Sequence, residues 1–346
     1  MIQAHTFDAW ASPTVRRSRF YWNSGILAGF AAPLFLWLAG LSLVMAAERS
    51  RAREGRWAVG ARACRRGLEV FVLAFLFRLQ AFVVSPGGHP ITLFRVDILN
   101  VMGPSMAAAG LVWMLVEDTA LQVTVYSVLA AAVALSAPLV RTAGFVNALP
   151  LWVSWYIRPH ADYTTFTLFP WAGFLLSGAA CGRLLAANSD AGHERRLQWG
   201  IAVAGLALAW LGWYTSFRPS IYAQSSFWTS SPTWFAIRLG LMMAALAALY
   251  ALAQVLEPKG WTLEPLARFG RSSLFVYWIH TELVYGYASW AWHRRLPVWG
   301  VVPAYAAFAA LMYGAVVLKD RVVSSAFWHL PQQRKSGQMA AMANEN

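Results

Sequence analysis

Long apolar runs, repeated along almost the whole chain, limit what this sequence can fold into. Each run is about as long as a helix that crosses the hydrocarbon core of a bilayer, roughly 20 residues. Only 12% of the residues are charged, against about a quarter in soluble domains. We therefore expect an all-α polytopic transmembrane helical bundle that forms a single domain over residues 1–346. The nine predicted spans are 26–47, 68–84, 98–116, 120–140, 166–186, 198–216, 235–256, 272–292 and 297–318.

Basic residues are distributed unevenly between the two sides of this predicted bundle. The loop 48–67 carries seven arginines, which marks the cytoplasmic side of a membrane. If the spans alternate, the loops on that side hold 16 Lys and Arg residues and the opposite loops hold nine. We therefore interpret the net charge of +13 as a signal for orientation and anionic lipid, not for nucleic acid. The prediction is a multi-pass protein of a bacterial-type cytoplasmic membrane, with a polar cytoplasmic C-terminal tail at 319–346.

Two segments do not fit a simple series of spans. The segment 149–157 is apolar and aromatic but too short to cross a bilayer, so we expect it to lie in the interface. Nine spans also leave the N-terminus outside, and no sequence device for its export is visible. We therefore expect a further span to precede Met1, which would make ten.

Two ionisable residues lie in the middle of the eighth run. A helix that starts at Ser272 places His280 about 12 Å and Glu282 about 15 Å along the span, near the bilayer midplane. Ionisable groups at this depth are costly and usually functional. Because the two residues are two positions apart, they point about 200° apart and cannot form a dyad alone. We expect each to find a partner on another helix, where Arg78 and Arg238 are the available cations.

Further candidates gather on the predicted outer side. His5 and Asp8 are three residues apart at a membrane boundary, and Arg95 and Asp97 open the third span. The structural alternatives are a solvated terminal histidine and an interfacial snorkelling pair. The sequence has no HExxH motif and no paired Cys/His spacing, so it predicts no metal site.

Four segments, in order along the chain, resemble the heparan-α-glucosaminide N-acetyltransferase family. They are GFAAPLFLWLAGLSL at 29–43, FRVDILNVMG at 94–103, TLFPWAGFLLSGAACGRLL at 167–185 and FGRSSLFVYWIHTEL at 269–283. The resemblance implies an acyl-CoA-dependent acyltransferase, an enzyme that takes acetyl-CoA from the cytoplasmic side. The acetyl group would pass to the amine of an amino sugar on the other side.

The resemblance also implies roles for single residues. In this family a histidine near the outer end of the site serves as base or acetyl relay, and His5 is the candidate here. Asp8 or Asp97 would orient it, and His280 with Glu282, the other two predicted catalytic residues, would support the channel between donor and acceptor. Substrate contacts are expected from Arg78, Arg95, Asn100 and Arg238. At 100–101 the chain has Asn-Val where the family has Gln-Arg.

Other functions stay open at this point. One is a membrane O-acyltransferase that modifies envelope polysaccharide or lipid. Another, of a different class, is a proton-coupled transporter or flippase that uses His280 and Glu282 as a proton relay, and a third is a non-catalytic scaffold. The expected partners are membrane lipid and a glycan or amino-sugar acceptor, with no nucleic acid, and a homodimer stays open.

Overall fold

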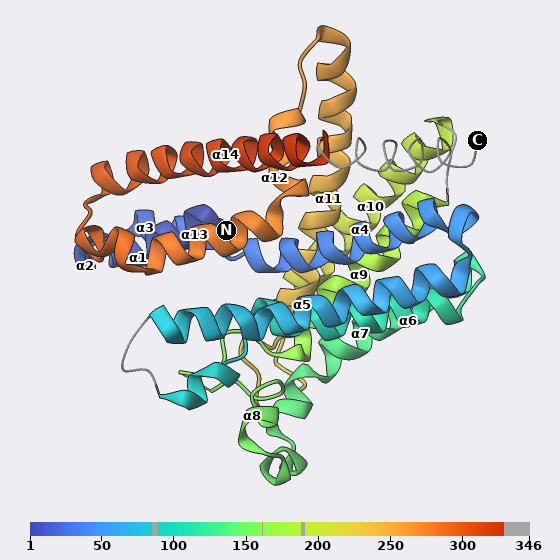
Figure 1. Cartoon of the computed structure of the whole chain (residues 1–346). Helices are drawn as coiled ribbons and strands as arrows, with labels where there is room; N and C mark the ends of the chain where they lie inside the picture. The colour runs from blue at the N-terminus through green and yellow to red at the C-terminus, as the bar shows by residue number, and fades with distance from the viewer. Residues whose placement is uncertain (85–88, 161, 188–190, 329–346) are drawn as a thin grey trace, which may run out of the picture. The chain divides into compact units, whose positions relative to one another are not determined.

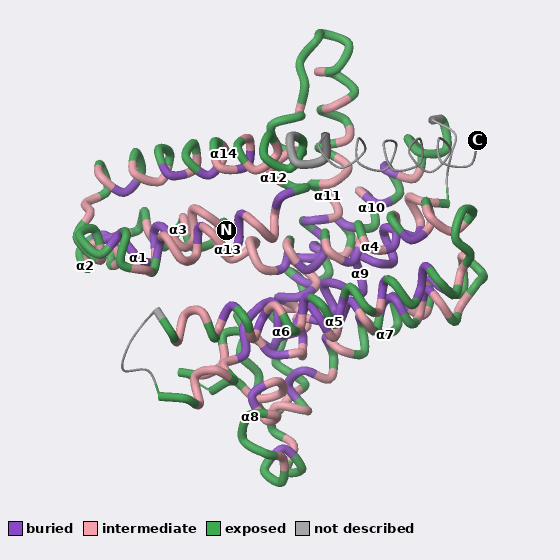
Figure 2. Tube along the Cα trace, viewed as in Figure 1, coloured by how far each residue is buried: buried purple, intermediate pink, exposed green. Residues whose placement is uncertain are grey.

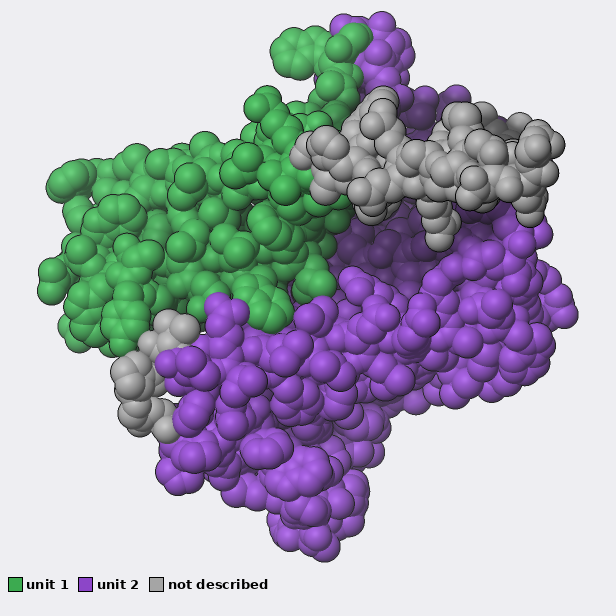
Figure 3. Space-filling model, viewed as in Figure 1, with its two compact units in different colours: residues 1–28, 260–346 green, residues 29–259 purple. Residues whose placement is uncertain are grey.

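The computed structural model describes residues 1–84, 89–160, 162–187 and 191–328, and nearly all of its regular structure is helical (Figure 1). This confirms the prediction of an all-α polytopic bundle. Within the described residues, seven helical segments are long and apolar enough to cross a membrane. They are Arg19–Glu54, Ile98–Leu115, Thr119–Thr142, Leu168–Ala186, Gly192–Ser216, Pro232–Lys259 and Val298–Ser324. The chain groups into two compact units, Met1–Ala28 with Gly260–Asn346, and Gly29–Lys259 (Figure 3).

The unit Gly29–Lys259 consists of seven long helices and several short turns. The long helices are α4 (Ala31–Glu54), α5 (Arg56–Val84), α6 (Ile98–Leu115), α7 (Thr119–Thr142), α9 (Leu168–Ala186), α10 (Ala191–Ser216) and α11 (Pro232–Leu256). The short ones are η1 (Pro90–Phe94), η2 (Gly144–Ala148), α8 (Leu151–Ser154) and η3 (Glu257–Lys259). Helix α9 packs against both α4 and α7, while α5 pairs with α6 and α10 with α11. Buried residues in this unit are concentrated on α6 and α9 (Figure 2).

Helix α9 approaches α4 closely because small residues face each other at the contact. A Cβ atom placed on Gly178 would overlap the backbone of Trp37, and one on Gly40 would overlap the carbonyl oxygen of Leu175. Only hydrogen at these two positions lets the backbones meet, as in other membrane helix pairs with small residues at the interface. This close approach makes α9 the buried centre of the unit, with Phe174 and Leu175 fully inaccessible.

The arginine-rich segment 48–67 differs from the predicted loop. Helix α4 continues to Glu54, a single residue, Gly55, turns the chain with a φ of 77°, and α5 starts at Arg56. The predicted second span, 68–84, is therefore only the latter part of α5. Arginine is a good helix former, and the long side chains here reach carboxylates along and between the helices, such as Arg62 to Glu54. The positive charge consequently lies on a helical hairpin.

The other unit contains the first three and the last helices of the chain. These are α1 (Ile2–Trp10), α2 (Pro13–Arg16), α3 (Arg19–Ala28), α12 (Glu264–Arg271), α13 (Ser273–Tyr285), η4 (Tyr287–Trp292) and α14 (Val298–Trp328). The side chains of Phe7 and Trp10 on α1 pack with Val284, Phe308 and Met312 in one buried cluster. Both chain segments are needed to form this core.

The predicted eighth span, 272–292, is wrong as a single helix. Helix α13 ends at Tyr285 after 13 residues, which is about 20 Å, shorter than the hydrocarbon core of about 30 Å. The carbonyl oxygen of Val284 accepts hydrogen bonds from Ser289 Oγ (2.6 Å) and His293 Nε2 (3.0 Å). These side chains satisfy an acceptor that a continuing helix would have bonded internally, so the chain turns into η4.

Three other predicted segments correspond to the observed helices in different ways. The predicted first span, 26–47, lies inside the longer segment Arg19–Glu54, in which residues 29–30 form a turn between α3 and α4. The segment 149–157 contains only the one-turn helix α8, in agreement with a segment that does not span. The first ten residues of the predicted tail, 319–328, continue α14, and residues 329–346 lie outside the described part.

Candidate functional site

The first helix and α13 bring two histidines into contact. His5 Nδ1 lies 2.8 Å from His280 Nε2, and the two rings are stacked with 4.9 Å between centroids and 12° between planes. His280 is fully buried. The partner of His280 on another helix is therefore His5, which lies 275 positions away along the chain. We expected a cation, Arg78 or Arg238, in this place, but Arg78 pairs with Asp97 instead.

The hydrogen bonds of this pair determine where its protons lie. His280 Nδ1 is 2.5 Å from the carbonyl oxygen of Val276, and a carbonyl oxygen can only accept, so Nδ1 carries a proton. In the neutral ring Nε2 of His280 is then the acceptor, and the proton between the rings belongs to His5 Nδ1. Nε2 of His5 consequently holds a lone pair, and no protein hydrogen bond occupies that nitrogen within the described residues.

The environment of His5 keeps its imidazole neutral. Burial, followed by the proximity of His280, lowers the pKa of His5 from 6.5 to about 3. A charged imidazolium would lose much of its hydration in this position. His5 is thus an uncharged base at neutral pH.

Asp8 lies next to the pair but does not contact either histidine ring. Its carboxylate accepts hydrogen bonds from Tyr285 Oη (3.0 Å) and Arg16 Nη2 (3.0 Å). The ring of Tyr285 in turn lies 5.6 Å from that of His5, measured between centroids. Asp8 therefore reaches His5 only through Tyr285, and its predicted role in orienting His5 stays a prediction.

Glu282 does not share the environment of His280. It lies two residues further along α13, where the side chain is half-buried while His280 is inaccessible. This agrees with the prediction that the two residues face different directions and form no dyad.

A second polar group surrounds the start of α6. Asp97 is buried and forms an ion pair with Arg78. Its Oδ1 also accepts a hydrogen bond from Thr165 Oγ1 at 3.1 Å, and Arg95 Nε lies 3.9 Å from the same oxygen. Asn100 is inaccessible, and its Oδ1 accepts from the Asp97 backbone N–H at 3.0 Å. The predicted pair Arg95 and Asp97 thus belongs to a network that fixes the beginning of α6.

Arg238 on α11 is a buried cation in an aromatic environment. Only 6% of the residue is exposed, and its guanidinium carbon lies 4.7 Å from the ring centroid of Phe30 and 4.8 Å from that of Trp234. Within the described part of the chain it has no carboxylate partner, and Nη1 is buried without a hydrogen bond. Such a group is costly to bury unless something pairs with it, so Arg238 is suited to bind an anion.

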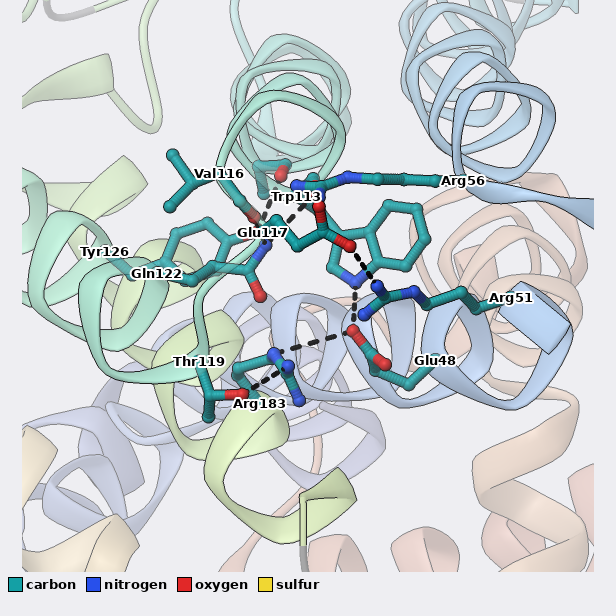
Figure 4. Close-up of polar contacts among 11 residues, drawn as sticks. Glu48, Arg51, Arg56, Trp113, Val116, Glu117, Thr119, Gln122, Tyr126 and Arg183 are labelled. Carbon is teal, nitrogen blue, oxygen red and sulfur yellow. Dashed lines mark hydrogen bonds and ion pairs between the residues drawn. The ribbon is translucent and has the colours of Figure 1, made fainter.

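A third cluster, which the sequence did not predict, joins α4, α6, α7 and α9 (Figure 4). Glu48 Oε1 accepts from Trp113 Nε1 at 2.8 Å and lies 3.5 Å from Arg183 Nε. Arg183 also donates to Thr119 Oγ1 at 2.5 Å. The Arg183 side chain is 6% exposed and that of Glu48 15%, so this is a largely buried ion pair.

The same cluster continues toward the α4–α5 turn. Glu117 is bound by Arg51 and lies 3.3 Å from Arg56 Nη1. Figure 4 shows these side chains converging from neighbouring helices on the carboxylate. One sequence signal could have indicated the cluster, namely an arginine inside a glycine-rich apolar run, because such a charge needs a buried acid.

A family model matches the chain. The protein-family model described as "Heparan-alpha-glucosaminide N-acetyltransferase, catalytic" matches residues 1–222. The matched range is more than half of the chain and includes His5, Asp8 and Asp97, whereas Arg238 and His280 lie beyond it. None of the curated proteins and none of the solved structures compared with the chain matches it.

Proposed function

The chain belongs to the heparan-α-glucosaminide N-acetyltransferase catalytic family, a family of membrane acetyltransferases, and on this premise we propose its substrates and its base. The proposed donor is acetyl-CoA, and the proposed acceptor is the amine of an amino sugar. The observation that carries the proposal is the lone pair on Nε2 of His5, in a neutral ring held by His280.

The proposed reaction uses His5 as general base. As the amine nitrogen attacks the thioester carbonyl carbon, Nε2 of His5 takes the proton that the amine loses. The C–N bond of the amide forms, the C–S bond breaks, and the thiolate of CoA leaves. Return of the proton from His5 to this thiolate restores the neutral imidazole.

His280 would act through His5 and not on the substrate. Its Nε2 accepts the Nδ1 proton of His5 and thereby fixes the tautomer that presents Nε2 as a base. Tyr285, held by Asp8, limits the tilt of the His5 ring. The predicted roles of Glu282 and Asp97 in catalysis stay predictions. The side chain of Asp97 already contacts Arg78 and Thr165 at the start of α6.

Arg238 is the residue we propose for an anionic group of a substrate. Acetyl-CoA carries several phosphates, and a buried guanidinium with an unbonded Nη1 can donate charge-assisted hydrogen bonds to one of them. Arg78 and Asn100 are less suited to such contacts, because Arg78 already pairs with the Asp97 carboxylate and Asn100 already binds the Asp97 backbone N–H. Arg95, which is half-exposed, is the remaining predicted substrate contact.

The proposed sidedness follows the arginine distribution. The hairpin of α4 and α5 would face the cytoplasm and attract the polyanionic donor. The C-terminus would lie on the same side, in a bacterial-type cytoplasmic membrane.

Transfer of labelled acetyl groups tests the proposal directly. The full chain, purified in detergent and reconstituted in lipid, is incubated with labelled acetyl-CoA and glucosamine. We expect labelled N-acetylglucosamine from the wild type and from His193→Gln, a variant of an exposed histidine on α10. The rate should fall in His5→Gln by about 10²–10⁴, the usual contribution of a general base.

The rival functions give different results in the same preparation. Transfer to N-acetylglucosamine, whose amine is blocked, would show an O-acyltransferase and contradict the amine acceptor. Proton-coupled uptake into proteoliposomes without acetyl transfer would favour a transporter. If His5→Gln transfers acetyl groups at the wild-type rate, His5 is not the base.

A further inference from the structure

Basic residues on the predicted outer side of the membrane gather in two short segments. Of the nine Lys and Arg residues assigned to that side, five lie at 16–19 and 294–295. Positive charge is disfavoured in short segments that must cross to the outer side. The concentration of arginine in these two segments therefore calls for a reason other than orientation.

The fold places the two segments next to each other within one compact unit (Figure 1). The backbone N–H of Arg294 donates to the carbonyl oxygen of Ala9 at 2.9 Å. The N–H of Leu296 donates to the Trp10 carbonyl oxygen, and the N–H of Ser12 donates back to the Leu296 carbonyl oxygen, both at 2.9 Å. These bonds hold the link between η4 and α14 against the connection between α1 and α2.

Arg294 adopts a backbone conformation that arginine rarely takes. Its φ is 55°, and among the residues that the structure describes it is the one non-glycine residue with a positive φ. This left-handed region favours glycine, and other residues there cluster at binding and active sites, where the surrounding structure holds them. The hydrogen bond to the Ala9 carbonyl oxygen is such a support.

Three arginines line a small pocket at this junction. The pocket has a volume of about 260 Å³, and its walls are Arg16, Arg17 and Arg294 together with Pro13. Guanidinium groups present N–H donors in a planar arrangement that matches the oxygens of phosphate. The pocket is therefore suited to an anion.

The charges around the pocket indicate the charge of its ligand. Arg16 is neutralised by Asp8, because its Nη2 donates to Asp8 Oδ1 at 3.0 Å and its Nη1 to the Asp8 carbonyl oxygen at 2.6 Å. The side chains of Arg17 and Arg294 have no carboxylate partner within the described part of the chain. Two positive charges without a counter-charge match a phosphate monoester, which carries about −1.5 to −2 at pH 7, better than a singly charged group.

The pocket adjoins the proposed catalytic group. Asp8, which binds Arg16, also accepts a hydrogen bond from Tyr285 Oη at 3.0 Å. The ring of Tyr285 lies 5.6 Å from that of His5 between centroids. Since one carboxylate and one tyrosine separate the pocket from the base, an anion in the pocket can belong to the molecule that presents its amine to His5.

We propose that Arg17 and Arg294, together with Arg16, bind the phosphate monoester of a phosphorylated amino sugar, and that this sugar is the acceptor of the acetyl group. The inference rests on the proposed acetyl transfer to an amine, and it names the class of amino sugar. Arg17 and Arg294 supply the two positive charges that the phosphate neutralises, while Arg16 also holds Asp8.

Direct binding tests the pocket without acetyl transfer. The purified full chain, in uncharged detergent and without acetyl-CoA, is titrated by calorimetry with glucosamine, glucosamine 1-phosphate and glucosamine 6-phosphate. We expect at least one of the two phosphates to bind about tenfold or more tightly than glucosamine, the effect of a charge-assisted hydrogen bond. The preference should decrease at high salt, because the pocket is open to solvent and screening weakens exposed charges.

Matched variants separate loss of the pocket from misfolding. Arg17→Gln and Arg294→Gly should each weaken binding of the phosphorylated sugar about tenfold. Glycine adopts a φ of 55° without strain, so Arg294→Gly removes the guanidinium and keeps the backbone. Arg19→Gln and Arg295→Gln change exposed arginines that do not line the pocket, and both should bind as the wild type does.

Acetyl transfer then tests whether the bound phosphate belongs to the acceptor. In the wild type, kcat/KM for the phosphorylated sugar should exceed that for glucosamine about tenfold or more, and in Arg17→Gln this ratio should fall toward one. Transfer with equal kcat/KM for all three sugars would overturn the inference and leave the proposed function intact. Tight binding of a phosphorylated sugar without transfer to any of the three would overturn the proposed function, and with it the assignment of this sugar as acceptor.

Three binding results would also overturn the proposal. Equal affinity for glucosamine and both phosphates would show that the pocket holds no phosphate. Inorganic phosphate that binds as tightly as the phosphorylated sugars would show a site for the free anion. Binding to vesicles of phosphatidylcholine with phosphatidic acid, lost in Arg17→Gln and without any binding of the sugar phosphates, would assign the pocket to a lipid headgroup.

Discussion

His280 accepts a hydrogen bond from His5, and this single contact at 2.8 Å connects helix α1 with helix α13. Since His280 Nδ1 is committed to the Val276 carbonyl oxygen, the contact decides which nitrogen of His5 is protonated. The proposed catalysis therefore depends on a residue that does not touch the substrate.

Replacing His280 should reduce turnover more than substrate affinity. In His280→Phe the Nδ1 proton of His5 loses its acceptor, so His5 can adopt the tautomer without a lone pair on Nε2. We expect kcat to fall by about tenfold or more while KM changes little, because only the transition-state interaction is lost. Steady-state kinetics of acetyl transfer measures both values. A raised KM with unchanged kcat would instead assign His280 to substrate binding.

The histidine pair also predicts how stability depends on pH. The pKa of His5 is about 3 in the fold and about 6.5 in the unfolded chain, so between these values only the unfolded state takes up the proton. Stability should decrease as the pH is lowered from about 6.5 toward 3. The melting temperature of the wild type should therefore fall more steeply over this range than that of His5→Gln. Parallel melting curves would contradict the buried neutral His5.

Arg238 should act on donor binding. Arg238→Gln removes a charge-assisted hydrogen bond worth about 1.5–3 kcal/mol, so we expect the KM for acetyl-CoA to rise about tenfold or more. The melting temperature should not fall, since the variant also removes a buried charge without a carboxylate partner. Arg218→Gln is the matched control, because Arg218 also lies over an aromatic ring, that of Tyr214 at 4.9 Å, but is exposed. An unchanged KM in Arg238→Gln would remove Arg238 from the donor site.

The contact of α4 with α9 leaves no room for a side chain at Gly178, so a substitution there should destabilise the fold. Gly178→Ala places a methyl group against the backbone of Trp37, so the two helices must separate and the core of the unit loosens. We expect the free energy of unfolding to fall by about 1–3 kcal/mol or more, as in other overpacked cores. Gly200→Ala on α10 is the control, because a Cβ there meets no atom within 4 Å, and alanine favours helix by about 1 kcal/mol. Equal melting temperatures of the two variants would contradict the close contact.

Breaking the buried ion pair of Glu48 and Arg183 should lower the free energy of unfolding more than breaking an exposed pair does. Glu48→Gln leaves Arg183 without a counter-charge, and breaking a buried pair in this way costs about 3–5 kcal/mol. Glu69→Gln, which breaks exposed contacts to Arg65 and Arg66, should cost less than about 1 kcal/mol. Chemical unfolding of both variants measures the difference. Recovery of stability in Glu48→Gln combined with Arg183→Met would support the pair as the cause.

Apolar runs and composition were sufficient to predict the fold class. The family was predicted from four segments, three of which lie within the matched residues 1–222. The element boundaries were less predictable where charged residues occur. Segment 48–67 looked like a loop because of its arginines, yet arginine favours helix and only Gly55 interrupts it. The run 272–292 looked like one helix because its composition is uniform, while Ser289 and His293 terminate α13 through the Val284 carbonyl oxygen.

The position of each candidate site residue along its helix could be predicted from the sequence, whereas the contacts between these residues could not. The sequence positions of His280 and Glu282 correctly predicted that the two side chains point in different directions, since this depends only on helical geometry. The contact of His5 with His280 depends on how distant helices pack, which no local pattern encodes. For the same reason Glu48 and Arg183 were each visible in the sequence, but their pairing was not.

The distance in sequence between the two histidines has a consequence for synthesis of the protein. At roughly 5–20 residues per second, a ribosome needs at least about 14 s to reach residue 280 after residue 5, and through that interval His5 has no imidazole to accept its proton. A nascent chain can thus contain all of the unit Gly29–Lys259 before the proposed base has its partner. If the proposed mechanism holds, acetyl transfer begins only when translation is almost finished.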